Sequence, residues 1–312
     1  MKLSSFKKKS AALVAATLAS CVFGASSAQA FWGLGYTNTE HPIVLVHGFI
    51  GFDDVGGAVQ YFNGIPAALS SGGADVHVVQ VSAGNSSEVR GEQLLAQVEE
   101  IVAATGADKV NLIAHSQGSP DSRYVAAVRP DLVASVSSVG GANWGTPLAD
   151  VIEDVNNPLS IALSEAFFSF VDLISEGGFP QDAEGALDTL TTEGAIAFNQ
   201  QYPAGLPSEY CGDDGQEVVN GVRYYSWGGN AIFTNIADIS DGFFATTSLA
   251  FDEPTDGIIA SCSQKLGRVL NVEYNMNHAD EVNQVLGLTA VFSPDPVSLF
   301  RQQANRLKRA GL

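Results

Sequence analysis

One serine stands where a buried strand is expected to turn sharply into a helix. The apolar run Val110 to Ile113 precedes the sequence Ala114-His115-Ser116-Gln117-Gly118, and a helical pattern follows it. A turn of this kind holds the serine in a strained backbone conformation, with its hydroxyl exposed above the edge of the sheet. Small residues two positions before and after the serine let the strand and the helix approach each other. We therefore predict that Ser116 is a nucleophile.

A serine hydroxyl is a weak nucleophile unless a general base lies within hydrogen-bonding reach. The chain order serine, acid, histidine is typical of α/β-hydrolases, and of the five histidines only His278 follows Ser116. It also comes shortly after the apolar run Val269 to Val272, where the loop after a last strand would carry it. We therefore predict His278 as the base. The other histidines are expected to take no part in the reaction: His47 braces its loop, His115 is structural, and His41 and His77 have no site role.

The acid partner of the histidine lies between Ser116 and His278 if that order holds. Asp256 directly precedes Gly257-Ile258-Ile259, a tight-turn sequence near the end of the chain. We choose it as the residue that orients His278 and stabilises the imidazolium. The candidates considered in that interval are Asp238, Asp241, Asp252 and Asp256.

An oxyanion hole needs two backbone N–H groups aimed at the oxygen that becomes negative. One belongs to the residue after the nucleophile, which is Gln117. The other comes from the loop after the first apolar strand, here His47-Gly48-Phe49, so we predict the Phe49 N–H as the second donor. Together these residues predict ester hydrolysis through a covalent acyl-enzyme.

Short apolar runs alternate with helical patterns and must position these residues. Such runs are typical of buried parallel strands. One intervening helix is expected to have Ser87 as its cap and to end at Gly106. The alternation predicts an α/β fold with a doubly wound, mostly parallel sheet. The expected strands are 43–46, 76–81, 110–113 and 133–139, with weaker candidates at 224–227 and 269–272.

The alternation of strands and helices breaks after about Ala142. Residues 150–205 are helical in pattern and contain no clear strand, and the stretch from Ile161 to Ile174 is very apolar before Gly177-Gly178 ends it. Two interpretations are open: an ordinary buried helix, or a mobile lid that a lipid surface opens over an apolar pocket. The position after the fourth strand, where hydrolase caps are inserted, favours an inserted helical lid over about 150–205.

The composition has 46% hydrophobic and 16% charged residues over 312 positions, which fits one large globular domain, or one domain with an elaborated cap. The chain has 34 acidic and 15 basic residues, a formal charge of −19. Four lysines and no acid lie in residues 1–30, so the remaining chain carries −23. Such a surface repels nucleic acid and anionic membranes, and it makes a cation site plausible.

The N-terminus has the pattern of an export signal. A basic segment to Ser10 precedes an apolar segment that is too short to span a bilayer, and Ala28-Gln29-Ala30 fits the small-x-small cleavage rule. We expect residues 1–30 to be a signal peptide, the α/β-hydrolase domain to occupy 31–312, and the protein to be secreted. The sequence Leu18-Ala19-Ser20-Cys21 also matches a lipoprotein cleavage box, which would instead leave a lipid anchor on Cys21.

Removal of that leader leaves two cysteines, Cys211 and Cys262. An even pair in an exported chain indicates one disulfide. Two buried free thiols are the alternative.

Five longer runs carry more specific information: Val44–Phe49, Glu88–Leu95, Arg123–Asp131, Asn277–Val285 and Pro296–Lys308. In these runs the chain resembles the secreted triacylglycerol lipases of the Pseudomonas and Burkholderia type, over nearly all of residues 41–309. The resemblance implies an α/β-hydrolase core with a helical lid. It also implies a triad on Ser116, Asp256 and His278, oxyanion donors on Phe49 and Gln117, and a single disulfide between Cys211 and Cys262.

The family also holds one structural Ca²⁺ near the catalytic histidine. By position its carboxylates fall on Asp238 and Asp280, and its carbonyl ligands fall on Gln284 and Leu288. Oxygen ligands suit this hard cation, which would fix the loop that carries His278. Many relatives need a membrane-bound foldase and a two-step secretion route. We expect both here, for a monomer that binds an ester substrate at an oil–water interface and no nucleic acid.

The chain departs from the family where Ala-His-Ser-Gln-Gly-Ser replaces Gly-His-Ser-His-Gly-Gly, and Phe49 is bulkier than the usual residue. These differences concern the acyl pocket and not the type of reaction. The first hypothesis is a secreted lipase that hydrolyses long-chain triacylglycerols. A short-chain esterase or an extracellular polyester depolymerase would use the same mechanism. A protein of the hydrolase fold that only binds lipid or a partner is the alternative from another class.

Overall fold

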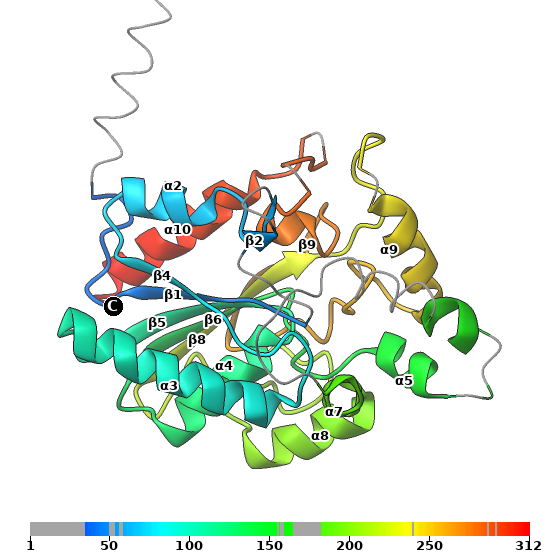
Figure 1. Cartoon of the computed structure of the whole chain (residues 1–312), viewed down its shortest axis with the longest axis horizontal. Helices are drawn as coiled ribbons and strands as arrows, with labels where there is room; N and C mark the ends of the chain where they lie inside the picture. Colours follow the sequence, from blue (N-terminus) through cyan, green and yellow to red (C-terminus); the bar gives the residue numbers. More distant parts are fainter. Residues whose placement is uncertain are drawn as a thin grey trace, which may run out of the picture.

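A mostly parallel sheet runs through the centre of the molecule, with helices on both of its faces (Figure 1). The computed structural model gives the strand order β4-β1-β5-β6-β8 with parallel pairing throughout. Two strands share the other edge of β8: β7 is antiparallel to it and β9 is parallel. The strands are β1 (Ile43–Val46), β4 (Val76–Val79), β5 (Val110–His115), β6 (Val133–Val139), β7 (Val218–Val219), β8 (Val222–Gly229) and β9 (Arg268–Tyr274), with β2 (Asp54–Val55) and β3 (Val59–Gln60) forming a separate antiparallel pair.

The structure describes residues 35–49, 54–55, 59–154, 156, 159–164, 182–238, 240–285, 287–290 and 292–312. The predicted signal peptide, Cys21 and most of the apolar stretch 161–174 lie outside these residues. Within the described part of the chain, no helix is long and apolar enough to cross a bilayer.

Alternate side chains of the strands pack in two separate cores. Val44 and Val46 pack with Leu94 under α3 and α4, while Ile43 and Leu45 pack on the face covered by α2 and α10 (Figure 1). This alternation explains why the strand sequences are continuously apolar, since both faces of the sheet are buried. The helices are α2 (Ile65–Ser71), α3 (Ser87–Thr105), α4 (Gly118–Val128), α5 (Pro147–Glu153), α7 (Ala183–Leu190), α8 (Thr192–Gln201), α9 (Asp241–Thr247) and α10 (Pro296–Arg309), with 3₁₀ turns η1 (Ser248–Ala250) and η2 (Asp280–Val282).

A cap of helices follows β6, as the break in the sequence pattern predicts. Residues 150–205 contain helices and no strand among those that the structure describes. The cap has its own apolar cluster, in which Leu148, Leu163 and Leu187 pack with Ile259 and Phe49. That cluster therefore joins the cap to two loops at the carboxyl edge of the sheet.

The cap is also fastened to the core by one buried cation. Arg123 of α4 donates to Asn199 Oδ1 at 2.8 Å and to the Tyr202 carbonyl at 2.5 Å. Its guanidinium lies 5.3 Å from the centroid of the Phe198 ring. Burial lowers the pKa of Arg123 to about 9, which still leaves the side chain protonated at neutral pH.

The predicted doubly wound sheet is confirmed, and each of the six predicted strands overlaps an observed one. The predicted helix cap is wrong by one position. Ser86, not Ser87, has the extended backbone of a cap, and its hydroxyl accepts a hydrogen bond from the Val89 N–H. Ser87 is the first helical residue and is buried. The sequence pattern does not distinguish two adjacent serines as caps. The helix ends at Gly106 as predicted.

Candidate active site

Ser116 lies in the tight turn that the sequence predicts. It has φ of 57° between the last residue of β5 and the first residue of α4, in the left-handed region that non-glycine residues rarely adopt. Strain of this kind costs about 1–3 kcal/mol and persists only where the surroundings impose it. Here the Ser116 N–H donates to the Val139 carbonyl at 3.0 Å. A Cβ at Gly118 would lie 2.8 Å from the carbonyl oxygens of Val46 and His47, which explains the small residue there.

His278 and Asp256 are brought together from two different loops. The His278 Nδ1 lies 2.8 Å from Asp256 Oδ2, and the His278 N–H donates to the Asp256 carbonyl at 3.0 Å. The carboxylate of Asp256 is fully buried and accepts from the N–H groups of Ile258 and Ile259 at 2.8 and 2.7 Å. Gln264 Nε2 donates to its other oxygen at 3.2 Å. The acid is therefore held in one orientation, in which it can fix the tautomer of the imidazole.

His115 connects the serine turn to this pair. It directly precedes Ser116, and its ring centroid lies 4.4 Å from that of His278. Its Nδ1 lies 2.5 Å from the Tyr61 hydroxyl, which accepts a hydrogen bond from the Gly48 N–H. Burial, and then the charge of His278, keep the pKa of His115 well below its usual value. His115 is thus a buried neutral side chain, in agreement with the predicted structural role.

A second carboxylate, Glu281, lies behind the histidines, and the sequence did not point to it. Its Oε2 is 3.2 Å from His115 Nε2 and 3.7 Å from His278 Nδ1. Its Oε1 accepts from the Gly229 N–H at 2.6 Å. Burial, and then the charge of Asp256, raise the pKa of Glu281 well above its usual value. The ligand atoms of His115, His278 and Glu281 are close enough to hold a metal ion, yet hydrogen bonds within the site engage all three.

The loop after β1 carries the predicted oxyanion donor Phe49, and Gly48 packs directly against the nucleophile. A Cβ at Gly48 would lie 2.5 Å from Ser116 Cβ and 3.0 Å from its Oγ. His47 braces the loop as predicted, since its Nε2 accepts from the Val81 N–H at 3.1 Å and its Nδ1 bonds the Gly48 carbonyl at 2.9 Å. Burial, and then the charge of Arg90, lower its pKa to about 3, so it stays neutral.

The other predicted donor, Gln117, stands at the N-terminus of α4, where backbone N–H groups lack acceptors within the helix. Its side-chain amide donates to the Asn85 carbonyl at 2.9 Å, which keeps the side chain away from a donor role. The two predicted donors therefore belong to separate segments, the loop after β1 and the turn after β5.

A buried arginine holds those two segments together. Arg90 Nε donates to Asp121 Oδ2 on α4 at 2.8 Å, and Nη2 donates to the carbonyls of His47 and Gly48 at 2.9 and 3.2 Å. Nη1 bonds the Ser82 carbonyl. Both charged side chains are fully buried. Burial raises the pKa of Asp121 to about 6 despite the opposing effect of Arg90. The sequence signal was an arginine on the buried face of a helix, in line with Leu94 and Val98.

Two of the predicted calcium ligands have unsatisfied oxygens. Asp238 Oδ2 and Asp280 Oδ1 are buried without a hydrogen-bond partner. Burial raises the pKa of Asp280 to about 7, with smaller contributions from the negative charges of Asp238 and Asp241. Gln284 and Leu288 lie further along the loop that begins at Asp280. Orphaned carboxylate oxygens that repel one another fit a hard cation.

The predicted disulfide is present and fastens the acid loop. Cys211 and Cys262 are bonded, across 51 residues of chain. Lys265 reinforces the same junction, because its Nζ donates to the Cys211 carbonyl at 3.0 Å and pairs with Asp213 Oδ1 at 2.6 Å. Asp256 therefore lies in a segment that both a covalent bond and an ion pair hold in place.

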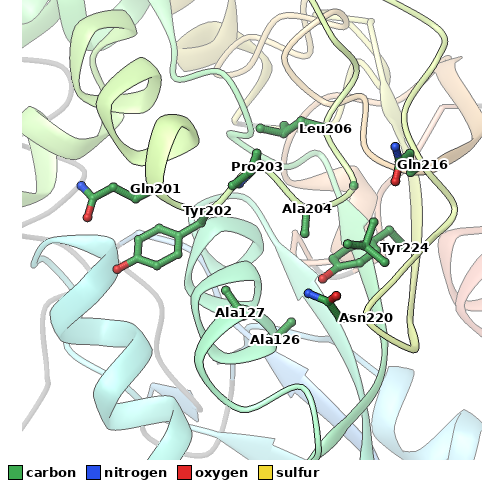
Figure 2. Close-up of a pocket in the computed structure, with 12 residues that line it drawn as sticks. Ala126, Ala127, Gln201, Tyr202, Pro203, Ala204, Leu206, Gln216, Asn220 and Tyr224 are labelled. Atoms are coloured by element: carbon green, nitrogen blue, oxygen red, sulfur yellow. The ribbon is translucent and has the colours of Figure 1, made fainter.

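A cavity of about 420 Å³ lies away from these residues (Figure 2). It is bounded by the C-terminal end of α4, the segment after α8 and the start of β8, whereas Ser116 follows the end of β5. None of the predicted site residues lines it, so it is not the acyl pocket. Among its lining residues are Ala126, Ala127, Tyr202, Leu206, Asn220 and Tyr224.

Known proteins are similar to this chain in sequence and in fold. Residues 41–164 match a family described as the alpha/beta hydrolase fold. The triacylglycerol lipase of Vibrio cholerae is 52% identical over 308 residues, which cover 96% of this chain and 98% of that protein. The chain belongs to the bacterial lipases of the α/β-hydrolase superfamily. This lipase is also 40% identical to the triacylglycerol lipase of Pseudomonas fragi, over 88% of this chain and 98% of the relative.

The fold of the lipase agrees with more distant solved structures. The mature form of the Bacillus licheniformis lipase BlEst2 superimposes with a TM-score of 0.60 at 19% identity, over 86% of this lipase and 92% of that chain. At that identity the likeness concerns the fold alone. The predicted α/β-hydrolase architecture is confirmed.

Replacement of Gly48 by alanine is expected to disable the lipase while leaving it folded. The added methyl group would meet Ser116 at 2.5–3.0 Å, and a displacement of about 1 Å at the reacting centre costs roughly 100-fold in rate. Kinetics on a soluble ester should show that loss in kcat/KM. Gly242→Ala is the control, because a Cβ there meets nothing within 4 Å. Full activity of Gly48→Ala would contradict the close packing.

Replacement of Arg90 is expected to lower both stability and activity, and a second substitution at Asp121 is expected to raise stability alone. Arg90→Met leaves Asp121 as an uncompensated buried charge, which should cost about 3–5 kcal/mol in denaturant unfolding. The double variant Arg90→Met/Asp121→Leu removes that charge and should recover part of the stability, since the buried carbonyls still lack a donor. Its kcat/KM should stay low, because the carbonyls of His47 and Gly48 lose their donor. Recovery of activity together with stability would show that the clamp on this loop is unnecessary.

Proposed function

We propose that this lipase hydrolyses long-chain triacylglycerols with Ser116 as nucleophile, His278 as general base and Asp256 as its orienting acid. The observation that carries the proposal is the 2.8 Å contact between His278 Nδ1 and Asp256 Oδ2, beside a serine in a strained turn. The named substrate of the Vibrio cholerae and Pseudomonas fragi relatives supports triacylglycerol as the ester.

The reaction divides into two acyl transfers. The Ser116 hydroxyl attacks the ester carbonyl while His278 takes its proton, and the buried Asp256 carboxylate stabilises the imidazolium. The N–H groups of Gln117 and Phe49 receive the negative oxygen of the tetrahedral intermediate. His278 then protonates the departing alkoxide of the glycerol. Water attacks the acyl-enzyme in the same way, with His278 again as base, and the fatty acid leaves.

A calcium ion is proposed as a structural part of this lipase, held by Asp238, Asp280 and the carbonyls of Gln284 and Leu288. The two orphaned carboxylate oxygens support this assignment. When bound, the ion supplies positive charge that neutralises two buried acids and joins their loops. Asp280 lies two residues from His278, so a rigid Asp280 loop keeps the base in register with Asp256.

Export and folding complete the proposal. The leader-like residues 1–30 and the disulfide between Cys211 and Cys262 are consistent with a secreted protein. We further propose that the chain acts as a monomer and folds with a lipase-specific foldase, as in the family that its sequence resembles. The intact mass of the exported protein separates cleavage before Phe31 from a lipid anchor on Cys21.

Ser116→Ala is expected to abolish hydrolysis of an emulsified long-chain triacylglycerol, because it removes the hydroxyl that forms the acyl-enzyme. The loss should be about 10⁶-fold, as for removal of a triad nucleophile. A pH-stat assay of the released fatty acid measures it, with the wild-type protein as reference. Cleavage of short soluble esters without hydrolysis of the emulsion would keep the triad and replace the lipase function by that of an esterase or polyester depolymerase.

Chelation of calcium is expected to destabilise the lipase. A ligand present at 100 times its dissociation constant adds about 2.7 kcal/mol to the folded state, which corresponds to roughly 5–10 °C in melting temperature for a domain of this size. Calorimetry with and without chelator measures this shift. Asp280→Asn should melt at the same temperature in both conditions. An identical melting temperature of the wild-type protein with and without chelator would eliminate the calcium site.

A further inference from the structure

The most exposed large apolar side chains lie in segments that leave the same edge of the sheet. They come from segments that follow the carboxyl ends of β6, β8 and β9, the edge of the sheet that also carries Ser116 and His278. Ligands of open α/β sheets bind outside this edge. In the described part of the chain, the apolar side chains with the largest exposed fractions are Ile161 (71%), Phe233 (72%), Ile236 (108%), Leu249 (62%) and Phe292 (102%).

Three of these residues lie on two neighbouring loops. Phe233 and Ile236 belong to the loop after β8, and Phe292 belongs to the segment between η2 and α10; Figure 1 shows the two loops projecting from the same side of the molecule. The Asn235 side chain donates to the Thr289 carbonyl at 3.1 Å, which ties the loops together. We call Phe233, Ile236 and Phe292 the apolar rim.

Hydrogen bonds fix the backbone of the loop that carries Phe233 and Ile236. The N–H groups of Thr234 and Asn235 donate to the buried Asp241 carboxylate at 3.1 and 3.2 Å. The Ala231 N–H donates to the Met276 carbonyl at 3.1 Å, which fixes the base of the same loop. Phe292 has φ of 72°, a strained conformation for an aromatic residue. The Phe292 side chain is also fully exposed, so its burial in the described part of the chain does not offset that strain.

The charge around the rim restricts the kind of surface that it can meet. Residues 230–264 and 275–300 contain no lysine or arginine, and Asp252 and Asp295 among them are exposed acids. Anionic lipid would be repelled by these acids and by the chain's formal charge of −19. An uncharged lipid surface accepts apolar side chains without that cost.

We propose that Phe233, Ile236 and Phe292 form a lipid-inserting anchor that seats the active-site edge on an uncharged triacylglycerol surface. The inference rests on the proposed lipase function, because that function supplies the surface. It differs from the predicted lid, since the rim belongs to the two loops that carry Asp238 and Asp280. These loops also border His278, so insertion of the rim presents the catalytic edge to the oil.

The test compares the triple variant Phe233→Ser/Ile236→Ser/Phe292→Ser with Val128→Ser/Val218→Ser. The control residues are also exposed, but they lie at the end of α4 and in β7, away from the catalytic edge. Adsorption to a triolein emulsion is measured by sedimentation, beside kcat/KM on a soluble short-chain ester. The rim variant should adsorb about 10- to 100-fold more weakly with its soluble-ester activity unchanged, and the control should match the wild type.

A fluorescence measurement keeps the inference testable if the triple variant folds poorly. Phe292→Trp should show a blue-shifted emission on addition of triolein emulsion, and Val128→Trp should not. Vesicles of anionic phosphatidylglycerol should give a smaller shift than the emulsion. Unchanged adsorption of the rim variant, or an unshifted Phe292→Trp emission, would overturn the anchor. Loss of all ester hydrolysis in the wild type would refute the proposed function instead, and the adsorption data would still decide the anchor.

Discussion

The buried guanidinium of Arg90 is the interaction on which the geometry of the site depends. It bonds the carbonyls of His47, Gly48 and Ser82 and the carboxylate of Asp121, so one side chain joins the ends of β1 and β4 to the helix that follows the nucleophile. A charge removed from water is tolerated only when its donors are satisfied. Arg90 uses backbone carbonyls as acceptors. Its charge can therefore be buried only when the loop adopts this conformation. The position of the oxyanion loop against Ser116 is the result.

Hydrogen bonds also connect the loop of Asp256 to the start of the cap. Thr146, at the start of α5, donates its hydroxyl to the Ile258 carbonyl at 2.5 Å, in the turn that holds Asp256. The Ser263 hydroxyl donates to the Gly145 carbonyl at 2.7 Å and accepts from the Trp144 N–H at 3.0 Å. The segment that roots the cap therefore also positions the acid loop. The start of the cap and the acid of the triad are consequently held by the same set of hydrogen bonds.

The sequence could predict what short stretches of chain determine. The turn around Ser116 and the apolar runs of the strands depend on residues near one another in the sequence. Asp256 and His278 could be assigned because chain order restricted the choice. Glu281 and Tyr61 could not, since their contacts with His115 span 166 and 54 residues and follow only from the packing of the finished sheet. The helix cap was placed at Ser87 instead of Ser86 because local sequence preferences are the same for two adjacent serines.

The loop that carries Asp256 is held by an ion pair and by a disulfide, and different solution conditions weaken each of them. The ion pair of Lys265 with Asp213 is open to solvent on the aspartate side, and dissolved salt weakens such pairs. The neighbouring bond between Cys211 and Cys262 is indifferent to ionic strength but is lost to reductants. Each fastener thus withstands the condition that removes the other. At low ionic strength both bonds act on the loop of Asp256, whereas in concentrated salt the disulfide is the one that remains.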